Sequence, residues 1–220
     1  VAFRLAEVLL DGSRARFDPQ DLLDLVALGT VADLVPLSSA ENRALVRAGL
    51  RVLQSARRPG VRALLQVAGI PPEEVSAQSI GFGLGPRINA AGRLADMTLG
   101  IECLVTEDAT RAADLAQQLD TINRERREVE AGMREQAELA LEHLMPEGEP
   151  PPALVLFDPE FHEGVVGIVA GRLKDRLHRP TFVFALAQDG SLKGSGRSIP
   201  GFRLRDALDL VAKRHPGVLK

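Results

Sequence analysis

Residues 193–198, with the sequence KGSGRS, combine residue types that bind phosphate groups. Ser195 offers a hydroxyl, Gly196 an accessible backbone, and Arg197 a guanidinium whose forked donors match phosphate oxygens. Lys193 precedes the glycines and the GxxxxGK spacing is absent, so the segment is not a Walker loop. It predicts a phosphate site of another kind, and a solvated Gly-Ser turn beside charged residues is the alternative.

A second candidate for phosphate binding is the segment 161–173, FHEGVVGIVAGRL. It follows an apolar run typical of a strand and opens a helical pattern at Gly164, and the N-terminus of a helix favours anions. His162 adds a side chain that can hydrogen-bond to a phosphate or a base. Gly167 and Gly171 follow at three- and four-residue steps, which indicates close backbone packing along the helix.

A lone aspartate lies among apolar residues in the segment 29–37, GTVADLVPL. We expect Asp33 to occupy a short turn and to be partly buried. Burial of an unpaired carboxylate is costly, so Asp33 should be paired, hydrogen-bonded or bound to a metal ion. An Asx turn or a helix cap is the alternative.

The segment 85–94, GPRINAAGRL, carries Arg87, Asn89 and Arg93. Four glycines between residues 81 and 92 are more than a regular element interior favours, so we expect a loop here. Arginines on such a loop can present forked donors to phosphate. A surface loop with solvated arginines is the alternative.

Helical periodicity dominates the elements before residue 145. Apolar residues at three- and four-residue steps predict helices over about 18–28, from about 39 to beyond 50, and over about 61–67. A longer pattern covers 106–145 without a proline, and at about 1.5 Å per residue its helix would span roughly 55–60 Å. That length is typical of a helix connecting two lobes.

After residue 150 the pattern changes to short apolar runs alternating with helical segments. Strands are predicted over 153–157 and 181–186, a third strand or loop over 192–198, and a turn at 189–190. Helices are predicted over 165–177 and 204–214. This βαββα order indicates a small α/β lobe.

Composition and charge set the wider limits. The chain is 45% hydrophobic with a net charge of −3, which argues against a uniformly basic nucleic-acid binder. Residues 150–220 nevertheless carry a net charge of +4, and the preceding residues −7. The single Cys103 lies among apolar residues, so we expect a buried, inert thiol and a reducing cytoplasm. No run is apolar enough for a membrane, and helical spacing from Val1 onward indicates a truncated start.

Taken together and in order, the four segments resemble the RecJ family of DHH phosphoesterases. Residues 27–37 look like the family's fourth motif, 85–94 like its next block, and 161–173 and 193–199 like stretches of its DHHA1-type lobe. The resemblance implies an α/β fold with two lobes joined by a long connecting helix. Residues 1–105 would be the C-terminal part of a DHH catalytic lobe, 106–145 the connecting helix, and 150–220 most of a nucleic-acid-binding DHHA1-type lobe.

The same resemblance implies a function. RecJ-like enzymes hydrolyse phosphodiester bonds of single-stranded DNA from a 5′ end in repair and recombination, with Mn²⁺ or Mg²⁺ in a two-metal site. Asp33 would be a metal ligand and catalytic residue. Ser195, Gly196 and Arg197 would hold the terminal 5′-phosphate or the strand next to it, with His162 and Gly164 nearby. Arg93, and more weakly Arg87 and Asn89, would face them across a cleft, and a helicase or single-strand-binding protein would be a partner.

The chain departs from the family in lacking the Asp-x-Asp pair and the Asp-His-His triplet, because its four histidines are scattered. One aspartate cannot hold two hard cations, so we expect the 220 residues alone to be inactive. Two alternatives stay open. One is a phosphodiesterase of short oligonucleotides or cyclic dinucleotides, and the other is a non-catalytic nucleic-acid-binding relative.

Overall fold

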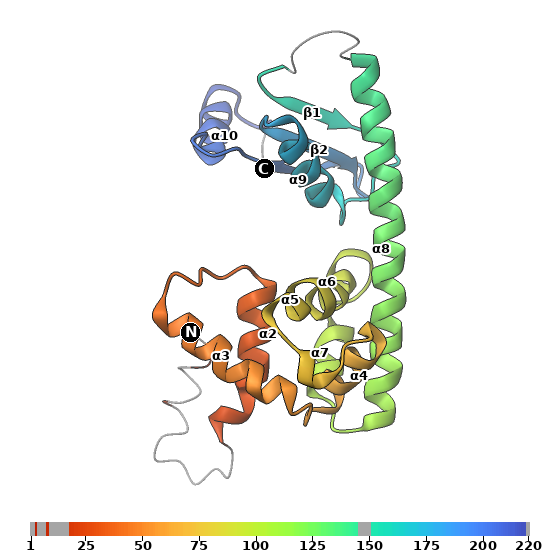
Figure 1. The fold of residues 1–220 in the computed structure, drawn as a ribbon. Coiled ribbons are helices and arrows are strands. Elements are labelled where there is room, and N and C mark those ends of the chain that lie inside the picture. Colours follow the sequence, from red (N-terminus) through yellow and green to blue (C-terminus); the bar gives the residue numbers. More distant parts are fainter. Residues whose placement is uncertain (1–2, 4–7, 9–17, 145–150, 219–220) are drawn as a thin grey trace. The chain divides into compact units, whose positions relative to one another are not determined.

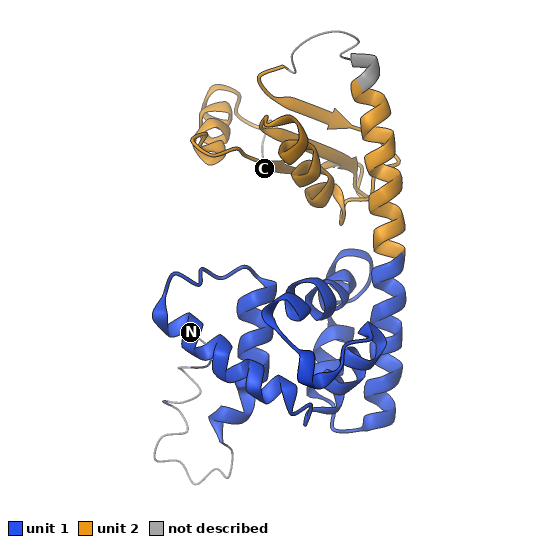
Figure 2. Ribbon diagram, viewed as in Figure 1, with its two compact units in different colours: residues 1–124 blue, residues 125–220 orange. Residues whose placement is uncertain are grey.

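The computed structural model describes residues 3, 8, 18–144 and 151–218. The helical pattern that begins at Val1 therefore lies almost wholly outside the described residues. The chain forms two compact units, residues 1–124 and 125–220, coloured separately in Figure 2. One long helix, α8 (Ala109–Leu144), contributes residues to both of them. The mixed α/β fold class and the long helix predicted from the sequence are thus confirmed.

The first unit is helical in its described part (Figure 1). A 3₁₀ turn (Pro19–Leu22) leads into α2 (Leu23–Ala32), so the helix runs about four residues beyond its predicted end near residue 28. The other helices are α3 (Ala40–Gln54), α4 (Pro59–Ala68), the short α5 (Ala77–Ser79), α6 (Gly85–Leu94) and α7 (Thr98–Val105).

Large apolar side chains from these helices form the core of the first unit. Helices α2 and α3 cross closely at Gly49, where a Cβ would stand 2.1 Å from the carbonyl oxygen of Leu23. Only glycine permits this approach, because any side chain would force the backbones apart. The core also takes buried residues from α4, α6, α7 and the first half of α8. Its largest fully buried side chains are Leu53, Leu64, Leu65, Ile80, Leu84, Leu115 and Leu119.

The glycine-rich segment predicted to be a loop is helical. Residues Ile80–Leu84 form a π-helical turn, and α6 follows directly. Both glycines lie close to other elements: a Cβ on Gly85 would lie 3.2 Å from that of Ala32, and one on Gly83 would lie 2.6 Å from Ile70 Cδ1. The loop prediction is therefore wrong, because these glycines serve close packing between elements.

The second unit contains a three-stranded sheet of β1 (Leu154–Phe157), β2 (Thr181–Leu186) and β3 (Leu192–Arg197), in the order β1-β2-β3. Strands β1 and β2 are parallel and are connected through α9 (Val166–Leu177), whereas β2 and β3 are antiparallel. Helix α10 (Leu204–Arg214) follows. The predicted βαββα order is confirmed, and the uncertain third strand is a strand.

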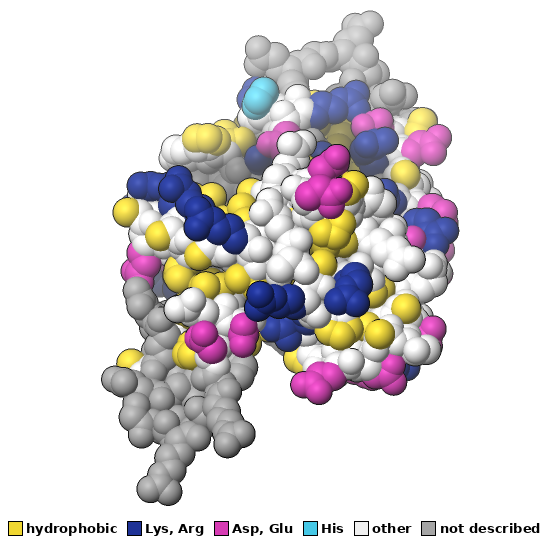
Figure 3. Space-filling view, turned by 60° about the horizontal axis from the view of Figure 1, so that its bottom comes forward, with side chains coloured by type: hydrophobic (Ala, Val, Ile, Leu, Met, Phe, Trp, Pro, Cys, Tyr) yellow, Lys and Arg dark blue, Asp and Glu magenta, His cyan; other side chains and the backbone are white. Residues whose placement is uncertain are grey.

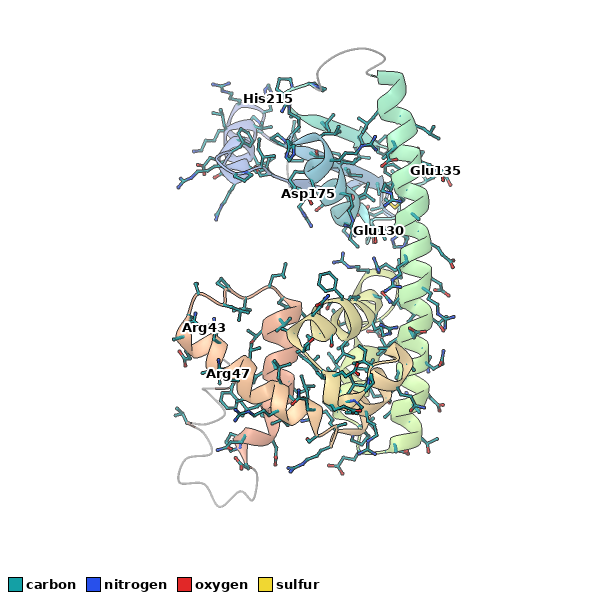
Figure 4. The ribbon with its side chains drawn as sticks, viewed as in Figure 1. Arg43, Arg47, Glu130, Glu135, Asp175 and His215 are labelled. Carbon is teal, nitrogen blue, oxygen red and sulfur yellow. The ribbon has the colours of Figure 1, made fainter. Side chains whose placement is uncertain are left out.

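Helix α9 packs against β2 and β3 of the sheet and forms ion pairs with the C-terminal half of α8. Its buried residues Val169 and Leu173 belong to the core of this unit. Glu130 of α8, labelled in Figure 4, accepts hydrogen bonds from Arg126 of its own helix at 2.6 Å and from Arg172 of α9 at 3.4 Å. A carboxylate shared in this way fixes α9 against α8.

Candidate phosphate site in the C-terminal unit

Strand β3 carries the predicted phosphate-binding residues. Because successive side chains of a strand point to opposite faces of the sheet, these residues lie on two faces. Ser195 pairs with Val183 of β2, and Val183 is fully buried. The face that carries Ser195 and Arg197 is also the one that meets α9, because both side chains lie next to Gly167 of that helix. The start of α9 therefore adjoins the hydroxyl and the guanidinium.

The two glycines of β3 face the other way, toward aromatic rings. A Cβ on Gly194 would lie 2.3 Å from the ring of Phe184, and one on Gly196 would lie 2.7 Å from that of Phe182. The two rings stack with centroids 6.4 Å apart. Packing against these rings explains why both positions are glycine. Binding of phosphate by the backbone of Gly196 stays a prediction.

The guanidinium of Arg197 is held in place by its neighbours but is not neutralised. Its Nη1 donates to the hydroxyl of Ser195 at 2.8 Å and to the carbonyl of Gly196 at 2.9 Å. Within the described residues no carboxylate forms an ion pair with Arg197, which is exposed. The other cation of the strand, Lys193, forms an ion pair with Glu163 at 3.0 Å. Arg197 thus presents Nε, Nη2 and an uncompensated positive charge to a ligand.

The segment that carries His162 and Gly164 is held beside β3 by contacts with β3 and α8. His162 Nδ1 accepts a hydrogen bond from the backbone N–H of Gly164 at 3.1 Å, so in the neutral ring Nε2 carries the hydrogen and can donate. The backbone N–H of His162 donates to Met133 Sδ of α8 at 3.4 Å. Glu163, between the two, is the partner of Lys193 on β3. The structure therefore brings His162 and Gly164 to the same part of the unit as β3.

Asp33 ends α2 in the first unit and is exposed, not partly buried as predicted. Its backbone N–H donates to the carbonyl of Gly29 at 3.0 Å, and Leu34 follows with a φ of 54° and 87% of its surface exposed. Apolar neighbours in sequence therefore do not bury the carboxylate. Asp33 caps the C-terminal end of α2 through its backbone N–H, and its role as a metal ligand stays a prediction.

Two residues of α3 hold the loop that follows Asp33. Arg43 Nη1 donates to the carbonyls of Leu37 and Ser38 at 2.7 and 2.8 Å, and Asn42 Nδ2 donates to that of Pro36 at 2.9 Å. Sequence reasoning missed both residues. Their only signal is a cation and an amide in the first turn of a helix next to the segment, a pattern too common to single them out.

Arg87, Asn89 and Arg93 all lie on α6, in the first unit, but not on one side of it. At 100° per residue Asn89 and Arg93 share a side, whereas Arg87 points elsewhere. Arg87 is largely buried: its Nε donates to Asp120 at 2.9 Å and its Nη1 to the carbonyl of Gly83 at 2.8 Å. These hydrogen bonds connect α6 to α8 and to the π-helical turn before it, so Arg87 stabilises the first unit. DNA binding by these three residues stays a prediction.

Charge on the first unit is mixed. On the face shown in Figure 3, Lys and Arg side chains lie in small groups between acidic and apolar ones. Among the residues that the structure describes, no group of three or more His, Cys, Asp or Glu side chains could hold a metal ion. A two-metal site does not fit the described residues, because Asp33 is a single carboxylate. Nor is any helix in the described part long and apolar enough to cross a membrane.

Gly167 adjoins the candidate phosphate site, which the spacing of the glycines did not predict. Its position predicted close backbone packing, yet a Cβ there would lie 2.7 Å from Arg197 Nη2 and 3.0 Å from Ser195 Oγ. Gly171, which the spacing grouped with it, has nothing within 4 Å of its Cβ position. The packing interpretation is therefore wrong for Gly171. Only the three-dimensional pairing of α9 with β3 distinguishes the two glycines.

The C-terminal part of the chain matches a known domain family, and most of the chain is similar to named proteins. Residues 151–220 match the DHHA1 domain family. The chain is 51% identical over 201 residues to the single-stranded-DNA-specific exonuclease RecJ of Dickeya dadantii, and 48% identical to that of Escherichia coli. Each alignment covers 90% of this chain and 35% of the relative. The chain is therefore RecJ-like over most of its length and spans about a third of the length of these relatives.

Solved structures agree with this assignment. A RecJ structure from Thermus thermophilus in complex with Mg²⁺ matches with a TM-score of 0.76 at 35% identity, over 89% of this chain and 29% of that one. A structure of exonuclease RecJ bound to manganese matches with the same TM-score and identity, over 95% of this chain and 50% of that one. The family resemblance inferred from four sequence segments is confirmed.

Proposed function

We propose that this chain is part of a divalent-metal-dependent exonuclease that degrades single-stranded DNA from a 5′ end, and that its C-terminal unit binds the terminal phosphate. The observation that carries this proposal is the Arg197–Ser195 pair. A guanidinium without a carboxylate partner, hydrogen-bonded to a hydroxyl at 2.8 Å, lies within the DHHA1 domain. The names of the relatives, single-stranded-DNA-specific exonucleases, supply the substrate class.

The chemistry of the pair suits a terminal phosphate. A 5′-phosphomonoester offers three oxygens and up to two negative charges, and charge-assisted hydrogen bonds to it are stronger than neutral ones. Ser195 Oγ accepts from Arg197 and keeps its own hydrogen for a ligand oxygen. His162 Nε2 offers another donor from the adjoining segment. An internal phosphodiester carries one charge fewer, so this group of donors favours the end of a strand.

The remaining assignments follow the family and belong to the same proposal. Residues 1–105 would be part of the catalytic lobe, 106–145 its connecting helix and 150–220 the DNA-binding lobe. Asp33 would be one ligand of a Mn²⁺ or Mg²⁺ site, the metals named for the RecJ structures, and its other ligands would come from outside this chain. Digestion in the 5′→3′ direction, a cytoplasmic location and recruitment by a helicase or single-strand-binding protein complete the proposal.

Removal of the Arg197 guanidinium tests the phosphate assignment. In the intact protein, Arg197→Ala should weaken binding of 5′-phosphorylated single strands by about 10- to 100-fold, the loss of one or two charge-assisted hydrogen bonds. Binding of 5′-hydroxyl strands should change far less. Arg203→Ala is the matched control, because Arg203 is 86% exposed and pairs with Asp206 at 3.5 Å. Equal losses for the two strand types would refute the proposal.

A further inference from the structure

Gly167 lies at the second position of α9, against the side chains of the proposed phosphate site. An ideal Cβ at this position would stand 2.7 Å from Arg197 Nη2, 3.0 Å from Ser195 Oγ and 3.5 Å from Arg197 Cζ. All three atoms belong to the same hydrogen-bonded pair. The space that a side chain would fill is thus occupied by the guanidinium itself.

We propose that Gly167 is a positioning residue: the missing side chain leaves the space in which the guanidinium of Arg197 is held beside the first turn of α9. This inference rests on the proposed binding of phosphate by Arg197. Glycine at this position leaves room for the ends of the Arg197 and Ser195 side chains, each of which would stand 3.0 Å or less from a Cβ.

Holding the guanidinium in advance matters for binding. An arginine side chain has many rotamers, and fixing one of them on binding costs entropy. Here the hydrogen bonds from Nη1 to Ser195 and Gly196 and the space above Gly167 fix it before a ligand arrives. Preorganised donors bind more tightly than donors that must be ordered at the moment of contact. Gly167 therefore contributes to affinity although it donates nothing to the ligand.

A methyl group at position 167 should displace the side chain of Arg197 and leave the fold intact. The atoms closest to the new methyl group are the end of a flexible, exposed arginine and a serine hydroxyl. Such side chains can move aside by rotation, whereas a backbone neighbour would not. Gly171 provides the matched control on the same helix, because nothing lies within 4 Å of its Cβ position.

The decisive experiment compares Gly167→Ala and Gly171→Ala in the intact protein. Binding of 5′-phosphorylated and 5′-hydroxyl single strands is measured by fluorescence anisotropy, and folding by circular dichroism and thermal melting. We expect Gly167→Ala to weaken binding of the phosphorylated strand roughly tenfold, through displaced charge-assisted donors. Binding of the hydroxyl strand should hardly change, and Gly171→Ala should leave both affinities unaltered.

A second set of variants separates positioning from a general structural effect. In an Arg197→Lys background, Gly167→Ala should no longer weaken binding, because lysine has no Nη2 to collide with the methyl group. The same should hold in an Arg197→Ala background. If the tenfold loss persists in either background, or if Gly167→Ala unfolds the protein, the positioning role is wrong. If Arg197→Ala itself does not affect the phosphorylated strand, it is the proposed function that fails.

Discussion

The carboxylate of Asp24 is nearly buried and accepts two hydrogen bonds from Arg58, from Nε at 2.8 Å and from Nη2 at 3.2 Å. Arg58 precedes α4, and its Nη1 and Nη2 also donate to the backbone carbonyls of Leu104 and Asp21. One guanidinium thereby joins α2, the start of α4 and the end of α7. This pair organises the first unit without belonging to the proposed site.

Loss of Asp24 should therefore destabilise the first unit. Asp24→Ala leaves Arg58, whose side chain is 22% exposed, without its carboxylate, and breaking such a pair costs about 3 kcal/mol. Chemical denaturation should show the loss as a lower midpoint with an unchanged slope. Asp21→Ala is the control, because that side chain is exposed and only its backbone carbonyl contacts Arg58. A loss below about 0.5 kcal/mol for Asp24→Ala, the size of an ordinary surface substitution, would contradict this account.

Glu130 should stabilise the docking of α9 on α8 in the second unit. Glu130→Gln removes the charge shared by Arg126 and Arg172, and we expect a loss of about 1 kcal/mol, smaller at high salt. Glu135→Gln, at an exposed position of the same helix labelled in Figure 4, should be neutral. Hydrogen exchange in α9 at low and high salt measures the difference. Equal protection of α9 in both variants would show that Glu130 does not contribute to its docking, which would then rest on apolar packing and the Arg176–Glu138 ion pair.

Cys103 should be unreactive in the folded chain. Burial, and secondarily the charge of Glu102, raises the pKa of this thiol from 9.0 to about 11. A thiol reagent at pH 8 should therefore modify Cys103 only after unfolding. Between pH 9 and about 11 the unfolded chain releases a thiol proton that the folded chain retains, so stability should fall as pH rises through this window. Cys103→Ala should abolish that part of the pH dependence, and rapid modification of the native protein would contradict the burial.

The loop after Asp33 should depend on Arg43. Arg43→Ala removes the bonds to the carbonyls of Leu37 and Ser38, so exchange of the backbone amides of residues 34, 35 and 37–39 should accelerate about fivefold, the equivalent of one lost hydrogen bond. Arg47, also labelled in Figure 4, lies one turn further along α3 and is exposed. Arg47→Ala should leave this loop unchanged. If both variants behave alike, the loop is held by other contacts.

Helices and strands whose apolar residues repeat at the helical or strand spacing could be predicted from the sequence. The second unit is the clearest case. The run 153–157 and the stepped residues of 165–177 correspond to β1 and α9 because each has one buried face. The helix of residues 85–94 was missed because its glycines are explained by contacts distant in sequence, such as that of Gly85 with Ala32.

The site could be predicted in composition but not in geometry. Ser195 and Arg197 are recognisable as phosphate donors from their types alone. Their partner Gly167 lies 28 residues before Ser195, and the contact exists only because α9 returns along β3. The exposure of Asp33 depends in the same way on the path of the chain after α2, where Leu34 turns outward with a positive φ. Local sequence carries no signal for either feature.

Asp33 should be essential for cleavage and dispensable for binding of the strand end, if it is one of several metal ligands. In the intact protein, Asp33→Ala should lower the Mn²⁺-dependent degradation of single-stranded DNA by at least about 100-fold, because loss of a ligand should cost more than the roughly 10- to 100-fold typical of a residue that only supports one.

Binding of 5′-phosphorylated strands should survive this substitution, because the proposed phosphate site lies in the other unit. Asp21→Ala is again the control, since Asp21 is exposed in the 3₁₀ turn ahead of the same helix. The 220-residue chain alone should be inactive with Mn²⁺, because one carboxylate cannot hold a metal pair. Degradation of DNA by the purified chain, or full activity of Asp33→Ala, would refute the proposal that Asp33 is one metal ligand and that the other ligands lie outside this chain.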